Sequence, residues 1–327
     1  MSIKAQAIRI DSFGGPEVLQ LREVEVGDPG PGEIRLRQTA IGLNYIDTYY
    51  RTGLYPLALP NGLGSEAAGI VEAVGEGVTT CSPGDRVAYS GGPPGAYASH
   101  RIVSALPVVK LPDGVSDEVA AAAMLKGGTV EFLVERCAKV EAGQTVLVQA
   151  AAGGVGLLLV QWLKHIGARV IATAGSPEKL ALAKTYGADE LIDYSHEAVG
   201  VRVRELTDGV GVATVFDGVG KATWEGSLDS LRKRGLMVSF GNASGPVGQI
   251  DFASLARKGS LFATRPTMFD YYVTREDIET GTSRLFELIS SGVLDVRIDQ
   301  RYPLADAAQA HRDLEARRTT GSTVLLP

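Results

Sequence analysis

QAAAGGVGLLLV, residues 149–160, stands between an apolar strand, TVLVQA, and an apolar helix that ends at Gly167. A glycine-rich turn in this position is typical of a dinucleotide site, because the N–H groups and positive dipole end of the helix attract a pyrophosphate. The G-x-G-x-x-G fingerprint is incomplete, since Ala151 precedes Gly153 and Gly156. Alanine fits the turn if its φ is negative. We therefore predict a dinucleotide-binding loop, the alternative being a glycine-rich turn without a ligand.

Strands and helices alternate around this loop, from Ser116 to about residue 265. The alternation predicts an α/β fold with a doubly wound parallel sheet, the Rossmann arrangement. The residues before Ser116 form short β-type runs between Gly- and Pro-rich turns, which predicts a barrel-like β domain. The chain closes with two helices and a strand, TVLLP, that we expect to return to the β domain. The predicted division is a catalytic domain at 1–124, a dinucleotide domain at 125–264 and a returning segment at 265–327.

The composition excludes several classes of protein. The formal net charge of −6 argues against a general nucleic-acid binder. Two cysteines, Cys81 and Cys137, cannot form a disulfide framework, which predicts a reducing compartment. The N-terminus lacks a secretory apolar region, and no apolar run reaches the roughly 18 residues that a spanning helix needs. We therefore predict a cytoplasmic protein with no membrane insertion and no nucleic-acid partner.

The second strand of the alternating region indicates which dinucleotide binds. An NAD site needs Asp or Glu about 20 residues past the fingerprint, to bind the ribose 2′-hydroxyl. Residues 169–177, RVIATAGSP, contain no acid, and Lys179 follows in the next helix. A lysine ammonium there can bind a 2′-phosphate as a point charge. The sequence favours NADPH over NADH, the alternative being that Lys179 is a solvated helix lysine.

Three motifs resemble one known superfamily: GLGSEAAGIVEAVGEGV (62–78), PGDRV (83–87) and AAGGVG (151–156). They are similar to the medium-chain dehydrogenases/reductases, which implies a GroES-like catalytic domain, a Rossmann domain and a tail that returns to the first domain. Zinc-dependent relatives carry a metal-binding histidine in G-H-E, where this chain has Ser65. A serine hydroxyl is a poor zinc ligand, and the four histidines and two cysteines are scattered. We therefore expect no zinc.

Further motifs narrow the resemblance to one branch, over nearly the whole chain. The branch is the zinc-free, zeta-crystallin-like NADPH:quinone oxidoreductases of bacterial type. It implies hydride or electron transfer from NADPH to a quinone in an interdomain cleft. The motifs are IGLNYIDTYYRTGLYP (41–56), MLKGGTVEFL (124–133), RGLMVSFGNASG (234–245) and ATRPT (263–267).

The resemblance implies four catalytic residues near the nicotinamide and the substrate: Asn44, Asp47, Tyr49 and Tyr55. Asn44 and Tyr49 would lie beside both molecules, Asp47 nearby, and Tyr55 would line the pocket. The alternative for Asn44 and Tyr49 is a role in turn capping and packing.

The resemblance also implies contacts to NADPH along the later strands and in the C-terminal tail. Gly175 and Lys179 would meet the 2′-phosphate, and Tyr194 would bound the adenosine half unless it belongs to the core. Gly218 stands where some relatives carry serine, and Arg265 is otherwise a surface arginine. The implied cofactor-binding residues are Asn44, Thr129, Ala152, Gly153, Gly154, Val155, Gly175, Lys179, Tyr194, Gly218, Phe240, Gly241, Asn242, Arg265 and Arg317.

Metal-free chemistry favours an acceptor that is already electron-poor, because no Lewis acid polarises the substrate. A quinone fits, and the alternative is an enal or enone reductase. A non-catalytic crystallin or RNA-binding protein is the alternative from another class. The resemblance further implies a homodimer joined through Rossmann sheet edges near residues 234–240. The basic run at 232–234 is expected to be a solvated helix end.

Overall fold

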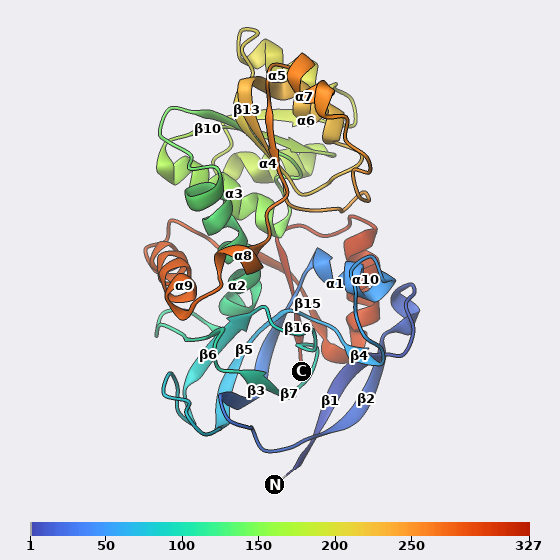
Figure 1. Cartoon of the computed structure of the whole chain (residues 1–327), viewed down its shortest axis with the longest axis vertical. Helices are drawn as coiled ribbons and strands as arrows, with labels where there is room; N and C mark the ends of the chain where they lie inside the picture. The colour runs from blue at the N-terminus through green and yellow to red at the C-terminus, as the bar shows by residue number, and fades with distance from the viewer. Residues whose placement is uncertain (1) are drawn as a thin grey trace. The chain divides into compact units, whose positions relative to one another are not determined.

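The computed structural model describes residues 2–327, which divide into two compact units (Figure 1). The first unit runs up to Gly128 and is completed by Tyr272–Ser290 and Val296–Pro327. The second unit comprises Thr129–Tyr271 and Ser291–Asp295. Residues from both ends of the chain therefore build the first unit, and the middle of the chain builds the second.

The first unit is built on two sheets. Its strands alternate buried and exposed side chains in part, as in β3, where Ile34 and Leu36 face the core. The strands are β1 (Ile3–Ile10), β2 (Gln20–Val26), β3 (Glu33–Leu43), β4 (Asn61–Gly62), β5 (Glu66–Val74), β6 (Arg86–Ser90), β7 (His100–Ser104), β8 (Val108–Lys110), β15 (Ile298–Pro303) and β16 (Ser322–Leu326). One sheet has the order β2-β1-β4, and the other has the order β15-β16-β3-β5-β6-β8, with β7 pairing to β3. The terminal strand β16 runs antiparallel to β3, with Thr323 opposite Leu43.

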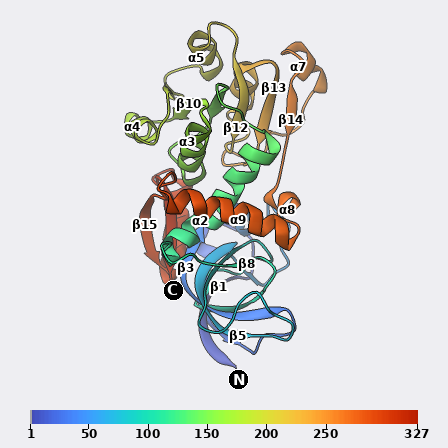
Figure 2. The same ribbon diagram turned by 90° about the vertical axis from the view of Figure 1, so that its left-hand side faces the viewer.

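Helices cover the larger sheet of the first unit. They are η1 (Pro16–Val18), α1 (Tyr45–Thr52), α2 (Asp117–Glu131), α9 (Arg275–Ser290), η3 (Leu304–Asp306) and α10 (Ala307–Glu315), and α2 continues past the boundary of the unit. Helix α9 lies across α2 (Figure 2). The two helices approach closely, since a Cβ at Gly127 would lie 2.4 Å from Leu285 Cδ1 and the leucine side chain would have to move.

The second unit contains a six-stranded parallel sheet. The strands are β9 (Thr145–Val148), β10 (Arg169–Ala174), β11 (Glu190–Asp193), β12 (Val212–Asp217), β13 (Leu231–Ser239) and β14 (Phe262–Thr264), in the order β11-β10-β9-β12-β13-β14. The helical segments are η2 (Phe132–Cys137), α3 (Gly154–Ile166), α4 (Pro177–Thr185), α5 (Val199–Leu206), α6 (Trp224–Ser230), α7 (Phe252–Arg257) and α8 (Met268–Tyr271). Every strand pair is parallel, which confirms the predicted α/β fold with a doubly wound sheet. The strand order reverses between β9 and β12, and this switch point is where such sheets bind ligands.

The basic run at residues 232–234 differs from its predicted structure. It is exposed, as expected, but it belongs to β13 and not to a helix end. Helix α6 ends at Ser230, and the pairing of β12 with β13 is irregular between Val212 and Thr214. The bulged register lets these residues continue the strand while their side chains face solvent.

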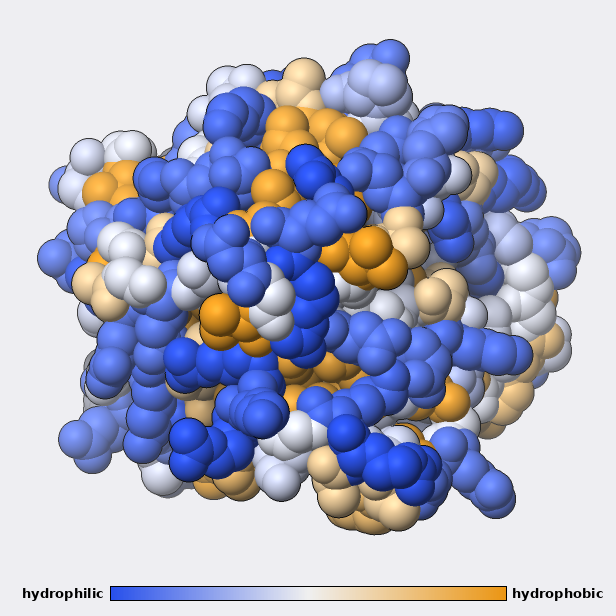
Figure 3. Space-filling model, turned by 90° about the horizontal axis from the view of Figure 1, so that it is seen from above, coloured by the Kyte–Doolittle hydropathy of each residue, from blue (hydrophilic) through white to orange (hydrophobic). Residues whose placement is uncertain are grey.

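The face of the molecule shown in Figure 3 is mainly hydrophilic. Figure 3 views the end at which α5, α6 and α7 lie in Figure 1, and there apolar residues form small areas between charged ones. Phe252, Phe262 and Val210 are among the exposed apolar residues. No helix within residues 2–327 combines the length and apolarity needed to cross a bilayer.

Candidate functional site

Two predicted catalytic residues form the cap of helix α1. Asn44 is the N-cap in an extended conformation, and its backbone N–H donates to Oδ2 of Asp47 at 2.9 Å. A carboxylate at the third helical position that bonds the N-cap N–H is half of a capping box. The N-x-x-D spacing therefore fixes both side chains within the first turn of the helix.

The Asp47 carboxylate is fully buried and gathers further donors. The Ser65 hydroxyl donates to Oδ1 at 3.2 Å, and the Tyr97 hydroxyl donates to Oδ2 at 2.8 Å. Burial raises the pKa of Asp47 to about 6, and the hydrogen bonds from Asn44 and Tyr97 act in the opposite direction. Asp47 is therefore a carboxylate whose charge depends on its hydrogen-bond donors.

A buried ion pair adjoins Asn44. Glu66 is fully buried and accepts from Asn44 Nδ2 at 2.6 Å, from Lys126 Nζ at 3.1 Å and from the Leu125 N–H at 2.6 Å. A buried carboxylate persists only with such partners. Sequence reasoning used the stretches that contain Glu66 and Lys126 for the resemblance, but it did not assign either residue to the site. Their juxtaposition depends on β5 and α2 packing together.

The predicted tyrosines lie together on and after α1. Tyr49 is 7% exposed, and its ring centroid lies 5.2 Å from that of Tyr55 and 5.7 Å from that of Tyr45. The Tyr50 ring meets Tyr55 edge-on at 5.8 Å. These separations lie in the range of favourable aromatic pairs. The predicted tyrosines therefore pack on one another as a single aromatic cluster.

Ser65, at the metal-binding position of the zinc-dependent relatives, is 3% exposed and bonds Asp47. Within residues 2–327, no three His, Cys, Asp or Glu side chains are grouped as metal ligands would be. The free cysteines Cys81 and Cys137 lie in different units, and Cys81 packs in the core of the first.

In the second unit, the predicted cofactor residues follow the carboxyl ends of the parallel strands. Parallel strands present these ends along one edge, so their loops converge there. The residues after β9, β10, β11, β12, β13 and β14 are, in that order, Ala152 to Val155, Gly175 with Lys179, Tyr194, Gly218, Phe240 to Asn242, and Arg265.

The loop after β9 has the geometry of an anion site. Ala150 takes the positive φ of 53°, whereas Ala151 is not among the described residues with positive φ, so alanine is tolerated there. The first bond inside α3 runs from the Leu157 N–H to the Gly153 carbonyl. The preceding N–H groups of the helix, at Gly154 to Gly156, are thus left for an external acceptor.

The two glycines of the fingerprint, Gly153 and Gly156, have different structural roles. A Cβ at Gly156 would lie 2.4 Å from the Ala150 carbonyl oxygen and 2.7 Å from Ala151 Cα, so this glycine lets the helix pack on the loop. A Cβ at Gly153 would meet only the Ala150 oxygen, at 3.5 Å. The side of the loop at Gly153 is therefore open to an approaching phosphate, as a dinucleotide requires.

The end of β10 carries two of the residues predicted to meet a 2′-phosphate, Gly175 and Lys179. Ser176 caps α4 by accepting from the Lys179 N–H at 3.4 Å, which places Lys179 in the first turn. Tyr194 lies over Gly175, where a Cβ would approach the Tyr194 hydroxyl to 2.6 Å. Tyr194 is 38% exposed, which places it at the surface and not in the core.

A buried polar network ties the strand ends together, and sequence reasoning missed it. The Thr173 hydroxyl donates to Gln149 Oε1 at 2.6 Å, Gln149 Nε2 donates to Ser227 Oγ at 3.0 Å, and Ser227 donates to Asp217 at 2.8 Å. Asp217 also accepts from the Val219 N–H at 2.8 Å. The network joins β9, β10 and β12 where the candidate loops begin. Polar residues at the ends of apolar strands are the signal that could have identified it.

The loops after the last three strands are also in contact. A Cβ at Gly241 would lie 2.1 Å from the Gly218 carbonyl oxygen, and one at Gly218 would lie 2.9 Å from the Phe240 ring. Arg265 Nη1 donates to the Gly241 carbonyl at 2.8 Å. The Asn242 amide, in its favoured orientation, accepts from Arg265 at 3.0 Å. Arg265 is therefore engaged with these loops and is not a free surface arginine.

Three predicted cofactor residues do not follow a strand of this sheet. Thr129 lies in α2 at the start of the second unit. Arg317 follows α10 in the first unit, with a φ of 58°, and its charge acts on the Tyr45 hydroxyl. Asn44 also belongs to the first unit, so the predicted cofactor residues are distributed over both.

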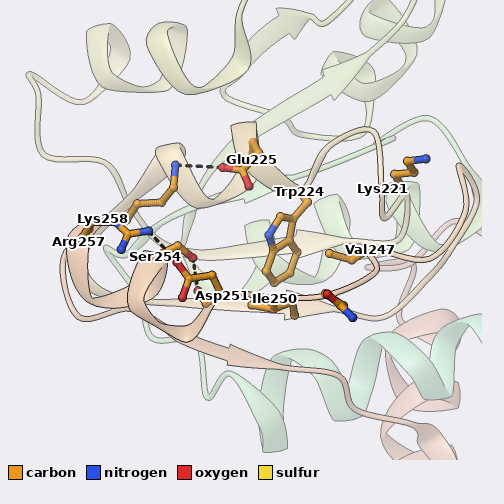
Figure 4. Close-up of a pocket in the computed structure, with 10 residues that line it drawn as sticks. Lys221, Trp224, Glu225, Val247, Ile250, Asp251, Ser254, Arg257 and Lys258 are labelled. Atoms are coloured by element: carbon orange, nitrogen blue, oxygen red, sulfur yellow. Dashed lines mark hydrogen bonds and ion pairs between the residues drawn. The ribbon is translucent and has the colours of Figure 1, made fainter.

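A separate pocket of about 500 Å³ lies beside α6 and α7 and contains none of the predicted residues (Figure 4). Lys258 Nζ lies 3.2 Å from Glu225, and Arg257 Nη2 lies 2.8 Å from Asp251. Because these two cations are already paired with carboxylates, we assign no cofactor phosphate to this pocket.

Family profiles match two parts of the chain, and individual proteins resemble it over almost its whole length. A profile described as alcohol dehydrogenase GroES-like domain matches residues 30–113, and one described as zinc-binding dehydrogenase matches residues 154–287. A quinone oxidoreductase of Pseudomonas aeruginosa is 54% identical over 99% of this chain and 100% of its own length.

Other relatives agree with this assignment. The crystal structure of Escherichia coli quinone oxidoreductase complexed with NADPH has a TM-score of 0.97 at 47% identity, covering 98% of this chain and 100% of that one. A 2-haloacrylate reductase of Burkholderia is 43% identical over 97% of this chain and 98% of its own length. These likenesses confirm the resemblance and the GroES-like assignment of the first domain. The chain belongs to the bacterial quinone oxidoreductase family of the medium-chain dehydrogenase/reductase superfamily.

Proposed function

We propose that this chain is an NADPH-dependent quinone reductase. One observation carries the proposal: the residues implied for NADPH follow the carboxyl ends of six parallel strands, at an edge with an open glycine loop. The names of full-length relatives at 47–54% identity support the same activity. NADPH, when bound, supplies the hydride. The side chains of this protein bind, orient and shield the reactants.

In the second unit, we assign phosphate binding to the helix N-terminus and to Lys179. The N–H groups of Gly154, Val155 and Gly156 hold the pyrophosphate, since no bond inside α3 uses them. Lys179 binds the 2′-phosphate and Gly175 lets Tyr194 approach. The Asp193 carboxylate, at the end of the neighbouring strand β11, is already bonded by the Ser195 N–H and by His196 Nδ1, each at 2.9 Å.

In the first unit, we assign substrate positioning to Asn44, Tyr49 and Tyr55. The tyrosine rings offer aromatic faces to a planar acceptor and exclude water. Glu66 and Asp47 fix Asn44 by its side chain and its backbone N–H. We propose that the reaction is independent of zinc, because Ser65 supplies a hydroxyl where relatives supply an imidazole. Retained turnover after EDTA treatment, with no stoichiometric metal by elemental analysis, would support this.

A second candidate is the reduction of conjugated enals or halogenated acrylates. The 2-haloacrylate reductase at 43% identity favours it, since that protein is named for a substrate with a conjugated double bond. Stopped-flow oxidation of NADPH with a panel of quinones and 2-alkenals compares kcat/KM directly. Higher values for the quinones are expected, and higher values for the alkenals would replace the proposal.

We expect Lys179→Ala to weaken NADPH binding about tenfold and to leave NADH binding unchanged, because only NADPH carries the 2′-phosphate. Lys184→Ala is the matched control, since Lys184 lies on the same helix but bonds the Asp189 carbonyl at 2.9 Å. Isothermal titration with both dinucleotides measures the effect. Equal losses for NADH and NADPH would contradict the phosphate assignment.

We further propose a homodimer in the cytoplasm, where the two free cysteines remain reduced. The dimer contact predicted near residues 234–240 needs correction, because β13 is paired on both sides. The edge strand next to β13 is β14, whose Phe262 is 61% exposed. An edge strand with an exposed aromatic residue is a pairing surface. Sedimentation equilibrium of the wild-type chain and of Phe262→Asp tests the proposal, and a wild-type monomer would refute it.

A further inference from the structure

A chain of buried polar groups connects Asp47 to the C-terminal helix α10. The Tyr97 hydroxyl bonds Asp47 at 2.8 Å and His311 Nε2 at 3.1 Å. The other ring nitrogen, Nδ1, lies 2.9 Å from Arg51 Nη1. Arg51 also holds Glu315 through two bonds, of 2.9 and 2.6 Å. Tyr97, His311 and Arg51 are each no more than 1% exposed, and α1 lies beside α10 (Figure 1).

Because Arg51 can only donate, it sets the donor and acceptor of each hydrogen bond between Arg51 and Asp47. A guanidinium only donates, so His311 Nδ1 must accept and the ring proton must be on Nε2. Nε2–H then donates to the Tyr97 oxygen, and the Tyr97 hydroxyl donates to Asp47. Reversal would place a proton on Nδ1, directly opposite the Arg51 N–H. All the donors therefore point towards the carboxylate.

We propose that Tyr97, His311 and Arg51 are positioning residues that hold Asp47 as a hydrogen-bond acceptor, and so hold Asn44 and Ser65 in place for catalysis. The catalytic part of this inference rests on the proposed function. The hydrogen-bond part concerns the protein alone and is measurable without turnover. Asp47 is thus linked, through Tyr97, to a residue 264 positions later in the sequence.

The charges around these hydrogen bonds favour donation towards Asp47. Asp47 faces Tyr97 from the segment after β6, Ser65 before β5, the N–H of Asn44 on its own helix, and the charges of Glu66 and Lys126. Tyr50 also senses the Asp47 charge. Burial and the neighbouring Arg51 lower the pKa of His311 to about 3, so the ring is neutral. A neutral ring with a fixed tautomer is what the donor chain requires.

The test compares two buried tyrosines. Tyr97→Phe removes one donor to Asp47, and we expect the acid limb of the kcat/KM profile to move up by about one pH unit. Tyr89→Phe is the matched control, because Tyr89 is 1% exposed and bonds Gln38 at 2.8 Å, away from Asp47. Its acid limb is expected to stay in place. Equal shifts in both variants, or none in Tyr97→Phe, would overturn the proposal.

Two measurements separate this inference from the proposed activity. Carbon NMR titration of Asp47 should show the same upward shift in Tyr97→Phe without any substrate. Nitrogen NMR should show His311 protonated on Nε2 only, and protonation on Nδ1 would overturn the donor direction. His311→Gln should keep the wild-type pKa of Asp47, since an amide can both accept from Arg51 and donate to Tyr97. His311→Leu can do neither, and the pKa of Asp47 should rise in it. If the NMR results are as expected but the protein does not reduce quinones, the proposed function is refuted and the hydrogen-bond inference stands.

Discussion

Replacing Gly156 by alanine is expected to lower the free energy of unfolding by about 3 kcal/mol and to weaken NADPH binding more than tenfold. The added Cβ would lie 2.4 Å from the Ala150 carbonyl oxygen and 2.7 Å from Ala151 Cα. Both are backbone atoms of the loop, so the loop and α3 must separate. Urea denaturation gives the stability change, and isothermal titration with NADPH gives the affinity change.

Gly153→Ala is the control that separates folding from binding. Gly153 has an extended backbone, with φ of −79° and ψ of 170°, and its Cβ would meet only one atom, at 3.5 Å. We expect its free energy of unfolding to stay within about 0.5 kcal/mol of wild type. Its NADPH affinity should nevertheless fall, because the methyl group occupies the side left open for the phosphate. Unchanged affinity in Gly153→Ala would place the pyrophosphate elsewhere.

The second large effect concerns acid stability. Burial and the charge of Arg51 lower the pKa of His311 from 6.5 to about 3 in the folded protein. Its contribution to stability is therefore complete above pH 6.5 and is lost as the pH falls towards 3. In His311→Gln, the loss of stability between pH 7.5 and pH 4.5 should be smaller than in wild type by about 3 kcal/mol. Urea titrations at the two pH values measure this difference.

The contribution of Asp47 to stability changes with pH in the opposite direction. Its folded pKa is raised from 3.8 to about 6, so its contribution is complete below pH 3.8 and is lost as the pH rises through 6. The comparison of His311→Gln with wild type leaves Asp47 in both proteins. His165→Gln, an exposed histidine on α3, should leave the pH dependence unchanged. If His311→Gln loses as much stability as wild type between pH 7.5 and pH 4.5, the pKa of His311 is not lowered in the folded protein.

The second unit could be predicted from local sequence patterns. Its strands β9, β10 and β12 are buried along nearly their whole length, so they appear as continuous apolar runs. The order of strand, glycine loop and helix then indicated the ligand edge. Residues 232–234 were assigned wrongly because a bulged, exposed strand carries the same basic side chains as a helix end.

The buried connections of the first unit could not be predicted in this way. Arg51 and His311 are 260 residues apart, and the chain carries no local pattern that pairs them. Lys126 likewise meets Glu66 only because α2 packs on the sheet. The sequence marked Asn44 and Asp47 through a motif, but it could not reveal which distant groups fix their charge and orientation.

The cap of α1 has a consequence for how this site can change. Asn44 and Asp47 start the helix, and we propose that they also belong to the active site, so one pair of residues would serve both folding and chemistry. A substitution at either position that alters substrate choice also removes the helix cap, which lowers the free energy of unfolding by about 1 kcal/mol. New specificities should therefore arise more readily at Tyr49 and Tyr55, whose rings can be exchanged without loss of the cap. Directed evolution of this site should accordingly retain the two capping residues and diversify the tyrosines.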